Sequence, residues 1–287
     1  MIKTFKHWVI PLILTVFGST LQAQEIKLNH WKFKKQDETK WYTAQVPGNI
    51  FTDLLNNHLI KDPFFNEKEL NWVSHNTWVY QTQFLIPKSL YKNKITQLNF
   101  EGIDTYSEIF LNGVLIGKTD NMFCSKTIEL KSSLLKRKNI LTIKIYPVNE
   151  IIKQKATQIL PIKYPDNDRV FVRKAAYQFG WDWGPNLPGA GIRKKVSITI
   201  LKEKEKIQNK TVNITVKPLL SFHQEPDSFG TNFYFKKENK PFFIKGANWI
   251  PADIFPSRIT FNDYQILLTS AKEAGINMLR VWGGGIY

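Results

Sequence analysis

The stretch Ile109-Phe110-Leu111-Asn112-Gly113-Val114-Leu115-Ile116 decides the fold class of most of the chain. Two apolar runs flank Asn112-Gly113, which is the strongest short signal for a two-residue β-hairpin, because both central positions need a positive φ. At 141–145 and 196–200, apolar residues alternate with polar ones, so each strand has one face in a core and one in water. Short strands between turn residues predict a β-sandwich of the jelly-roll type over 24–201.

Aromatic residues make up 14% of the chain, and many fall within this predicted sandwich. Large rings fill the space between two sheets, so we expect most of them in the core. They are Trp31, Trp41, Trp72, Trp78, Tyr80, Phe100 and Phe110. The single cysteine, Cys124, excludes an internal disulfide, and beside Phe123 it is expected to be a buried small apolar residue.

The first residues have the pattern of a secretory signal peptide. Lys3 and Lys6 form a short basic region, an apolar run follows at 8–17, and Leu21-Gln22-Ala23 offers a cleavage site. We therefore expect residues 1–23 to be removed and the protein to be exported, periplasmic or extracellular; a retained N-terminal anchor is the alternative. No later segment is long and apolar enough to span a membrane.

The formal net charge is +16, which raises the question of nucleic-acid binding. The lysines are scattered through the predicted strands and loops, where solvated lysines protect sheet edges. No nucleic-acid partner is therefore expected. The five histidines show no metal-ligand spacing, so neither a metal nor a cofactor is expected.

The character of the sequence changes after the sandwich. A Lys/Glu-rich link begins at Lys202, and Phe233-Tyr234-Phe235 predicts a strand, but the residues between are too few for a second complete sandwich. Beyond Pro241, Phe242-Phe243-Ile244 has the continuous apolar character of a strand covered on both faces.

A helix and a second strand follow this segment. Thr260 with Asp263 resembles a capping box, apolar residues at helical spacing follow, and Gly275 ends the helix. Met278 to Trp282 then predicts another buried strand. Strand, helix and strand form a βαβ unit, the opening of a parallel α/β fold.

Three long motifs occur in order in the second half of the chain. They are Arg173-Lys174 with Gly180-Trp181-Asp182-Trp183-Gly184-Pro185, then Lys245-Gly246-Ala247-Asn248-Trp249-Ile250-Pro251, and Asn277-Met278-Leu279-Arg280-Val281-Trp282-Gly283-Gly284-Gly285-Ile286-Tyr287. Together with Phe100-Glu101-Gly102-Ile103-Asp104-Thr105 and Asn112-Gly113, they make the chain resemble the β-mannosidases of glycoside hydrolase family 2. The resemblance covers nearly all of the mature chain.

The resemblance implies a mainly β protein: a galactose-binding-like jelly-roll sandwich over 24–201, followed by the incomplete start of a (β/α)8 TIM barrel over 236–287. Such a barrel needs roughly 250 residues. Residues 202–235 would be a linker and the remnant of an immunoglobulin-like sandwich. The implied activity is removal of terminal non-reducing β-D-mannose, with retention, from an oligosaccharide or glycan partner. Another exo-glycosidase of the family, such as a glucosaminidase, is the alternative.

The resemblance also implies sugar-binding residues. Trp181 and Asp182 lie on a loop that reaches the barrel mouth in the family, where a carboxylate can accept from hydroxyl groups and an indole can cover a sugar face. The alternative is a sandwich corner in which the rings are core. The remaining candidates end the first two barrel strands, on the face that bears active sites: Asn248, Trp249, Arg280 and Trp282. Arg280 is equally well explained as a buried ion-pair partner.

The two catalytic carboxyl groups that the resemblance implies are not in this sequence. In the family both are glutamates on later barrel strands, about 5–5.5 Å apart, and the acid/base follows an Asn. The Asn-Glu pairs present, Asn66-Glu67 and Asn149-Glu150, precede the barrel. We therefore assign no catalytic residue and expect an inactive fragment; a standalone carbohydrate-binding module is the alternative. The sequence does not predict the oligomeric state.

Overall fold

The computed structural model describes residues 24–92, 94–158, 168–201 and 220–287. The predicted signal peptide and the Lys/Glu-rich link lie outside these ranges. None of the helices within them is long and apolar enough to cross a membrane.

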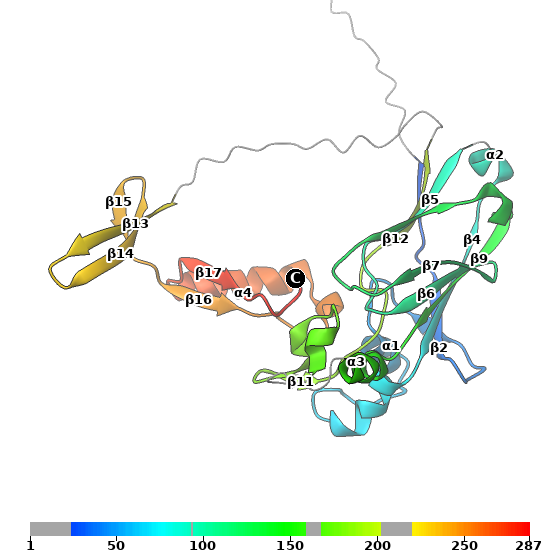
Figure 1. The fold of residues 1–287 in the computed structure, drawn as a ribbon, viewed down its shortest axis with the longest axis horizontal. Helices are drawn as coiled ribbons and strands as arrows, with labels where there is room; N and C mark the ends of the chain where they lie inside the picture. Colours follow the sequence, from blue (N-terminus) through cyan, green and yellow to red (C-terminus); the bar gives the residue numbers. More distant parts are fainter. Residues whose placement is uncertain (1–23, 93, 159–167, 202–219) are drawn as a thin grey trace, which may run out of the picture.

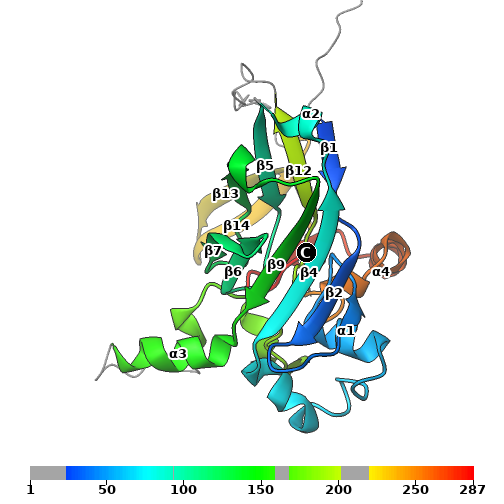
Figure 2. The same ribbon diagram turned by 90° about the vertical axis from the view of Figure 1, so that its right-hand side faces the viewer.

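Two antiparallel sheets form the sandwich (Figures 1 and 2). The six-stranded sheet has the order β3-β2-β4-β9-β6-β7. Its strands are β2 (Trp31–Lys35), β3 (Tyr42–Ala44), β4 (Trp78–Leu85), β6 (Ser107–Leu111), β7 (Val114–Thr119) and β9 (Lys138–Ile145). The four-stranded sheet has the order β1-β12-β5-β8. It consists of β1 (Gln24–Lys27), β5 (Ile95–Phe100), β8 (Lys126–Leu130) and β12 (Val196–Leu201).

The predicted hairpin and alternating strands are confirmed. Asn112 and Gly113 connect β6 to β7 with φ of 52° and 87°. In β9, Leu141, Ile143 and Ile145 are fully buried between the sheets, and apolar residues of β5 and β12 complete the same core. This alternation is what a strand with one solvated face requires.

The prediction of core aromatics is right for four of the seven residues. Trp31, Trp78, Tyr80 and Phe100 are buried, and Trp31 and Trp78 donate their indole N–H to the carbonyls of Leu28 and Val73. In contrast, Trp72 is 41% exposed, and Trp41 and Phe110 are half-buried.

The prediction of a buried Cys124 is wrong, because its side chain is exposed. The Asn121 carboxamide accepts the Phe123 N–H at 2.9 Å and closes a turn at this point. The turn directs the residues after it outward, so Phe123 is also 49% exposed.

Short helices cover the open ends of the sandwich. They are α1 (Ile50–Asn56), η1 (Lys68–His75), α2 (Lys88–Tyr91), η2 (Ser132–Leu134), α3 (Val148–Thr157), η3 (Asp168–Phe171) and η4 (Ala176–Gln178). Asn49 begins α1 with a capping box that includes Thr52. The chain then forms the hairpin of β10 (Phe179–Trp181) and β11 (Gly184–Asn186) before it enters β12.

A separate three-stranded antiparallel sheet follows the sandwich. It consists of β13 (Leu220–Asp227), β14 (Gly230–Lys237) and β15 (Lys240–Phe242), and it extends away from the sandwich in Figure 1. The predicted strand Phe233-Tyr234-Phe235 is part of β14. The prediction that Phe242 to Ile244 form a strand covered on both faces is wrong. Phe242 ends the edge strand β15, and Phe243 is 80% exposed beyond it.

The βαβ unit is present, but its first strand lies later than predicted. β16 (Gly246–Trp249) and β17 (Met278–Val281) pair in parallel, and α4 (Phe261–Glu273) connects them, after the short helix η5 (Pro256–Arg258). Thr260 and Asp263 form the expected capping box, and Gly275 follows α4 with a φ of 77°. Two strands and one helix bury little surface, so the expectation that the second strand is buried is wrong: Val281 is 61% exposed.

Candidate functional site

The β10–β11 hairpin and the ends of β16 and β17 meet at a cluster of aromatic rings. Trp181 lies 5.1 Å from Trp282, centroid to centroid, and Trp183 meets Trp282 edge-on at 5.9 Å. Tyr177, from η4, stacks on Trp183 at 5.5 Å. We call these four residues the tryptophan cluster. It joins side chains of the sandwich to the residue that directly follows β17.

Local sequence explains why the hairpin can approach the βαβ unit. Gly180 has a φ of 90°, a conformation that L side chains rarely adopt. At Gly184, a Cβ atom would lie 3.2 Å from the Ile254 side chain, so a glycine allows close packing there. On the outer side, Glu67 accepts the backbone N–H of Asn186 at 3.0 Å and fixes the end of the hairpin.

The segment between β16 and η5 attaches the βαβ unit to the sandwich. Ile254 and Phe255 are 6% and 2% exposed, and both belong to the sandwich core. Phe255 stacks on Phe51 of α1 at 5.7 Å, and the Tyr177 hydroxyl donates to the Ile254 carbonyl at 3.2 Å. Buried aromatic area of this kind fixes the relative placement of the two parts.

The six sequence-predicted site residues fall into two groups at this junction. Trp181 and Trp282 are in direct contact, and the exposed Asp182 follows Trp181 at the hairpin turn. Asn248 and Arg280 face each other across β16 and β17, where the Arg280 guanidinium donates to the side-chain amide oxygen of Asn248 at 3.3 Å.

Trp249 stacks on Tyr264 of α4 at 6.3 Å. The Tyr287 hydroxyl is 2.9 Å from each of the carbonyl oxygens of Trp249 and Trp282, and so connects the ends of the two strands. Arg280 is exposed and forms no ion pair within the described residues, so the alternative of a buried ion-pair partner is wrong.

Two further residues belong to the site although they were not among the six predicted site residues. The Arg169 guanidinium lies 4.9 Å from the centroid of a Trp181 ring, in the range of a cation–π contact. Trp183 is the other residue, because its buried indole N–H has no acceptor among the described residues. An aromatic wall with nearby carboxylate, amide and guanidinium groups is the arrangement that carbohydrate sites use.

A buried polar network supports the hairpin from behind. Lys174 donates to Asp104 at 2.5 Å and to the Gly189 carbonyl at 2.8 Å, and its side chain is fully buried. The Gln178 amide nitrogen donates to the other Asp104 oxygen at 3.2 Å. Burial lowers the pKa of Lys174, while the Asp104 carboxylate raises it. The network fixes η4, which carries Tyr177 into the tryptophan cluster.

Neither Asn-Glu pair contributes to the tryptophan cluster. Glu67 holds the hairpin from outside, as described above, and Glu150 pairs with Lys153 at 3.0 Å and with His75 at 3.4 Å. The hairpin itself carries one carboxylate, Asp182. Within the described ranges, no three His, Cys, Asp or Glu side chains gather in a way that could hold a metal ion.

Comparison with known proteins identifies the class. Residues 31–194 match the model of the glycosyl hydrolase 2 galactose-binding domain-like family. The match covers more than half of the chain, and the chain belongs to glycoside hydrolase family 2.

The similar proteins include several that are named as β-mannosidases. The β-mannosidase of Mus musculus is 27% identical, over 98% of this chain and 45% of its own length. The crystal structure of the β-D-mannosidase from Dictyoglomus thermophilum is 32% identical with a TM-score of 0.81, over 92% of this chain and 45% of that one. An exo-β-D-glucosaminidase at 14% identity and a TM-score of 0.60 shares the fold.

The chain spans less than half the length of the curated relatives it matches. The alignment with the mouse protein also runs over 395 residues, although this chain has 287. The mouse protein therefore has more than a hundred residues within the matched region that have no counterpart here.

Proposed function

We propose that the chain is a β-mannosidase-type polypeptide whose tryptophan cluster, with Asp182, forms part of the site for a terminal non-reducing β-D-mannose residue. The partner is then a β-mannoside oligosaccharide or glycan. The contact between Trp181 and Trp282 carries the proposal, because it places a sandwich loop at the C-terminal ends of two parallel strands. Active sites of (β/α)8 barrels lie on that face, and β16 and β17 would be the first two barrel strands.

We further propose that these residues alone do not hydrolyse the glycosidic bond. A retaining mechanism needs a nucleophile and an acid/base, two carboxyl groups about 5–5.5 Å apart. The hairpin supplies only Asp182, and the aspartate next to the cluster in the polar network, Asp104, is held by Lys174 and Gln178. The basic and apolar pattern of residues 1–23 supports an exported protein.

Binding and turnover are tested separately on the whole chain. We expect mannobiose to quench the intrinsic tryptophan fluorescence saturably, and an aryl β-mannoside to show no hydrolysis above background. Trp181→Ala and Asp182→Asn should each weaken binding about tenfold or more. The first removes the indole that covers a sugar face, and the second removes the charged acceptor for the sugar hydroxyl groups. Trp72→Ala is the matched control, since Trp72 has the same exposed fraction, 41%, at a different place on the sandwich.

Two outcomes would contradict the proposal. Equal losses in the Trp181 and Trp72 variants would place the sugar elsewhere, and hydrolysis by the wild-type chain would show that the catalytic pair is present. A panel of aryl glycosides and free sugars separates β-mannoside recognition from recognition of a glucosaminide.

A further inference from the structure

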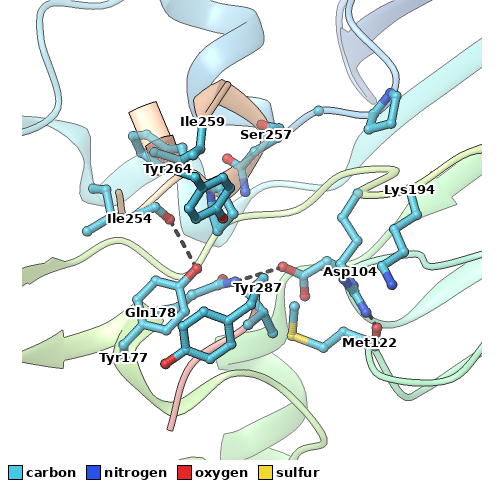
Figure 3. A pocket seen from close by; sticks show the side chains of 17 residues that line it. Asp104, Met122, Tyr177, Gln178, Lys194, Ile254, Ser257, Ile259, Tyr264 and Tyr287 are labelled. Carbon is cyan, nitrogen blue, oxygen red and sulfur yellow. Dashed lines mark hydrogen bonds between the residues drawn. The ribbon is translucent and has the colours of Figure 1, made fainter. Parts of the chain in front are cut away.

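A cavity lies at the junction of the sandwich with the βαβ unit; Tyr177 of the tryptophan cluster lines it, but none of the six predicted sugar-site residues does (Figure 3). Its volume is about 270 Å³. That is just below the lower end of the range for small-molecule sites, roughly 300–1,000 Å³, and it suits one ring rather than an oligosaccharide. We call it the junction cavity. Gln178 and Arg193 from the sandwich, and Ser257 and Tyr264 from the other side, are among its lining residues.

One buried acceptor in the junction cavity has no partner. Gln178 is 6% exposed, and its amide nitrogen must face Asp104, since an aspartate oxygen only accepts. The amide oxygen is then left without a donor among the described residues. A buried polar atom in this state favours a ligand that brings a hydroxyl group.

The charges around the cavity are not balanced. Its one carboxylate, Asp104, is already paired with Lys174, and the nearby Asp253 is paired with Arg258 at 2.5 Å. Arg193 uses its Nε atom to donate to the Met122 carbonyl at 2.8 Å, and no other hydrogen bond of its guanidinium occurs in the part of the chain that the structure describes.

Lys194 is the second cation at the cavity. Its side chain is exposed at the rim and forms no ion pair with a described residue. Burial lowers the pKa of Arg193, as expected for a cation that is withdrawn from water without full compensation. Two cations, Arg193 and Lys194, beside the Gln178 amide oxygen without a donor favour a ligand that is both anionic and hydroxylated.

We propose that the junction cavity binds a hydroxylated carboxylate of monosaccharide size, of which a hexuronate is the simplest example. The ligand carboxylate accepts from Arg193 and Lys194, and a ring hydroxyl donates to the Gln178 amide oxygen. Tyr264 and Tyr287 line the same space and offer ring faces to the sugar (Figure 3). Tyr177 lines the cavity and also stacks on Trp183 of the tryptophan cluster, but the proposal does not rest on the activity proposed for that cluster.

The test is calorimetric titration of the whole chain with D-glucuronate at low ionic strength, beside D-glucose and acetate. Glucuronate should bind saturably, and the other two about tenfold more weakly or not at all, because each lacks one of the two recognised groups. Lys194→Met should weaken glucuronate binding about fivefold. Lys195→Met is the matched control, because the neighbouring Lys195 pairs with Glu25 at 2.6 Å outside the cavity.

Ser257→Trp fills the cavity from a half-buried turn and should abolish binding, with an unchanged circular dichroism spectrum showing that the chain is folded. Three results would overturn the proposal. These are equal affinity for glucuronate and glucose, full binding by folded Ser257→Trp, and loss of glucuronate binding in Trp181→Ala. Loss of glucuronate binding in Trp181→Ala would assign the ligand to the tryptophan cluster. If Trp181→Ala loses mannobiose binding alone, the proposal for the junction cavity is unaffected.

Discussion

Two aspartates buried in the sandwich illustrate how single residues set its stability. Asp53 and Asp104 are 1% and 2% exposed. Asp104 is paired with Lys174, but among the described residues Asp53 receives only neutral donors, the Gln45 N–H and the Tyr80 hydroxyl, each at 2.8 Å. A buried carboxylate without a cation is costly, so the two sites respond differently to pH and to substitution.

Asp53 makes the sandwich less stable as the pH rises. Burial raises its pKa to about 7, from 3.8 for an ordinary aspartate. The folded chain therefore holds a proton that the unfolded chain releases, and the free energy of unfolding falls between about pH 4 and about pH 7. Urea titrations at pH 5 and pH 8 measure this loss. Between the two pH values, the free energy of unfolding should fall by about 2 kcal/mol more in the wild type than in Asp53→Asn.

The control for this measurement is Asp37→Asn, since Asp37 is exposed. It should leave the difference between the two pH values as in the wild type. If the difference in free energy of unfolding between the wild type and Asp53→Asn is the same at both pH values, Asp53 is ionised throughout.

Lys174→Met should be strongly destabilising. It leaves Asp104 buried without its cation, and breaking a buried pair from one side costs about 3–5 kcal/mol. The double variant Asp104→Asn/Lys174→Met removes both charges and should lose less than the sum of the two single variants. Additive losses in denaturant unfolding would show that the 2.5 Å contact contributes no coupling energy.

At the scale of elements, α4 is the helix whose ends the sequence predicted best. The side chain of Thr260 accepts the Asp263 N–H at 3.3 Å, and Asp263 accepts the Thr260 N–H at 2.8 Å. Thr260→Ala should therefore cost about 1 kcal/mol. Thr260→Ser keeps the hydroxyl and should cost much less. Hydrogen exchange of the first turn of α4 measures both, and equal protection in the two variants would contradict a capping role.

Elements with local signals could be predicted from the sequence, and elements defined by their neighbours could not. Asn112-Gly113 and the capping box determine their own conformation, and both are where the sequence placed them. The apolar run Phe242 to Ile244 resembles a buried strand, but burial depends on what packs against it. Here an antiparallel hairpin ends at Phe242, and parallel pairing begins at Gly246.

The site residues also divide into those that a sequence motif marks and those that only their neighbours in the fold define. Trp181, Asp182 and Trp282 could be named from long motifs, although they lie about a hundred residues apart in the chain. Arg169 and Tyr177 join them only through tertiary packing, and no motif marks them.

At the scale of the whole molecule, the sandwich and the βαβ unit differ in how completely they bury their apolar residues. The sandwich has a continuous core, into which Ile254 and Phe255 insert. The βαβ unit has no buried residue on α4, and its β17 is exposed along most of its length. Its order therefore depends on contacts with the sandwich, chiefly through those two residues and Trp282.

The exposed apolar residues of the βαβ unit predict self-association at high concentration. Phe261, Ile266 and Leu268 of α4 are 83%, 54% and 48% exposed, and β17 adds Val281 at 61%. Exposed apolar patches of this kind favour contact between molecules. Sedimentation velocity should show a concentration-dependent increase in mass that Ile266→Lys reduces without changing the free energy of unfolding. Phe229→Lys is the control, because Phe229 is 99% exposed but lies at the tip of the β13–β14 hairpin. An equal reduction in both variants would show that net charge, rather than the exposed residues of the βαβ unit, governs association.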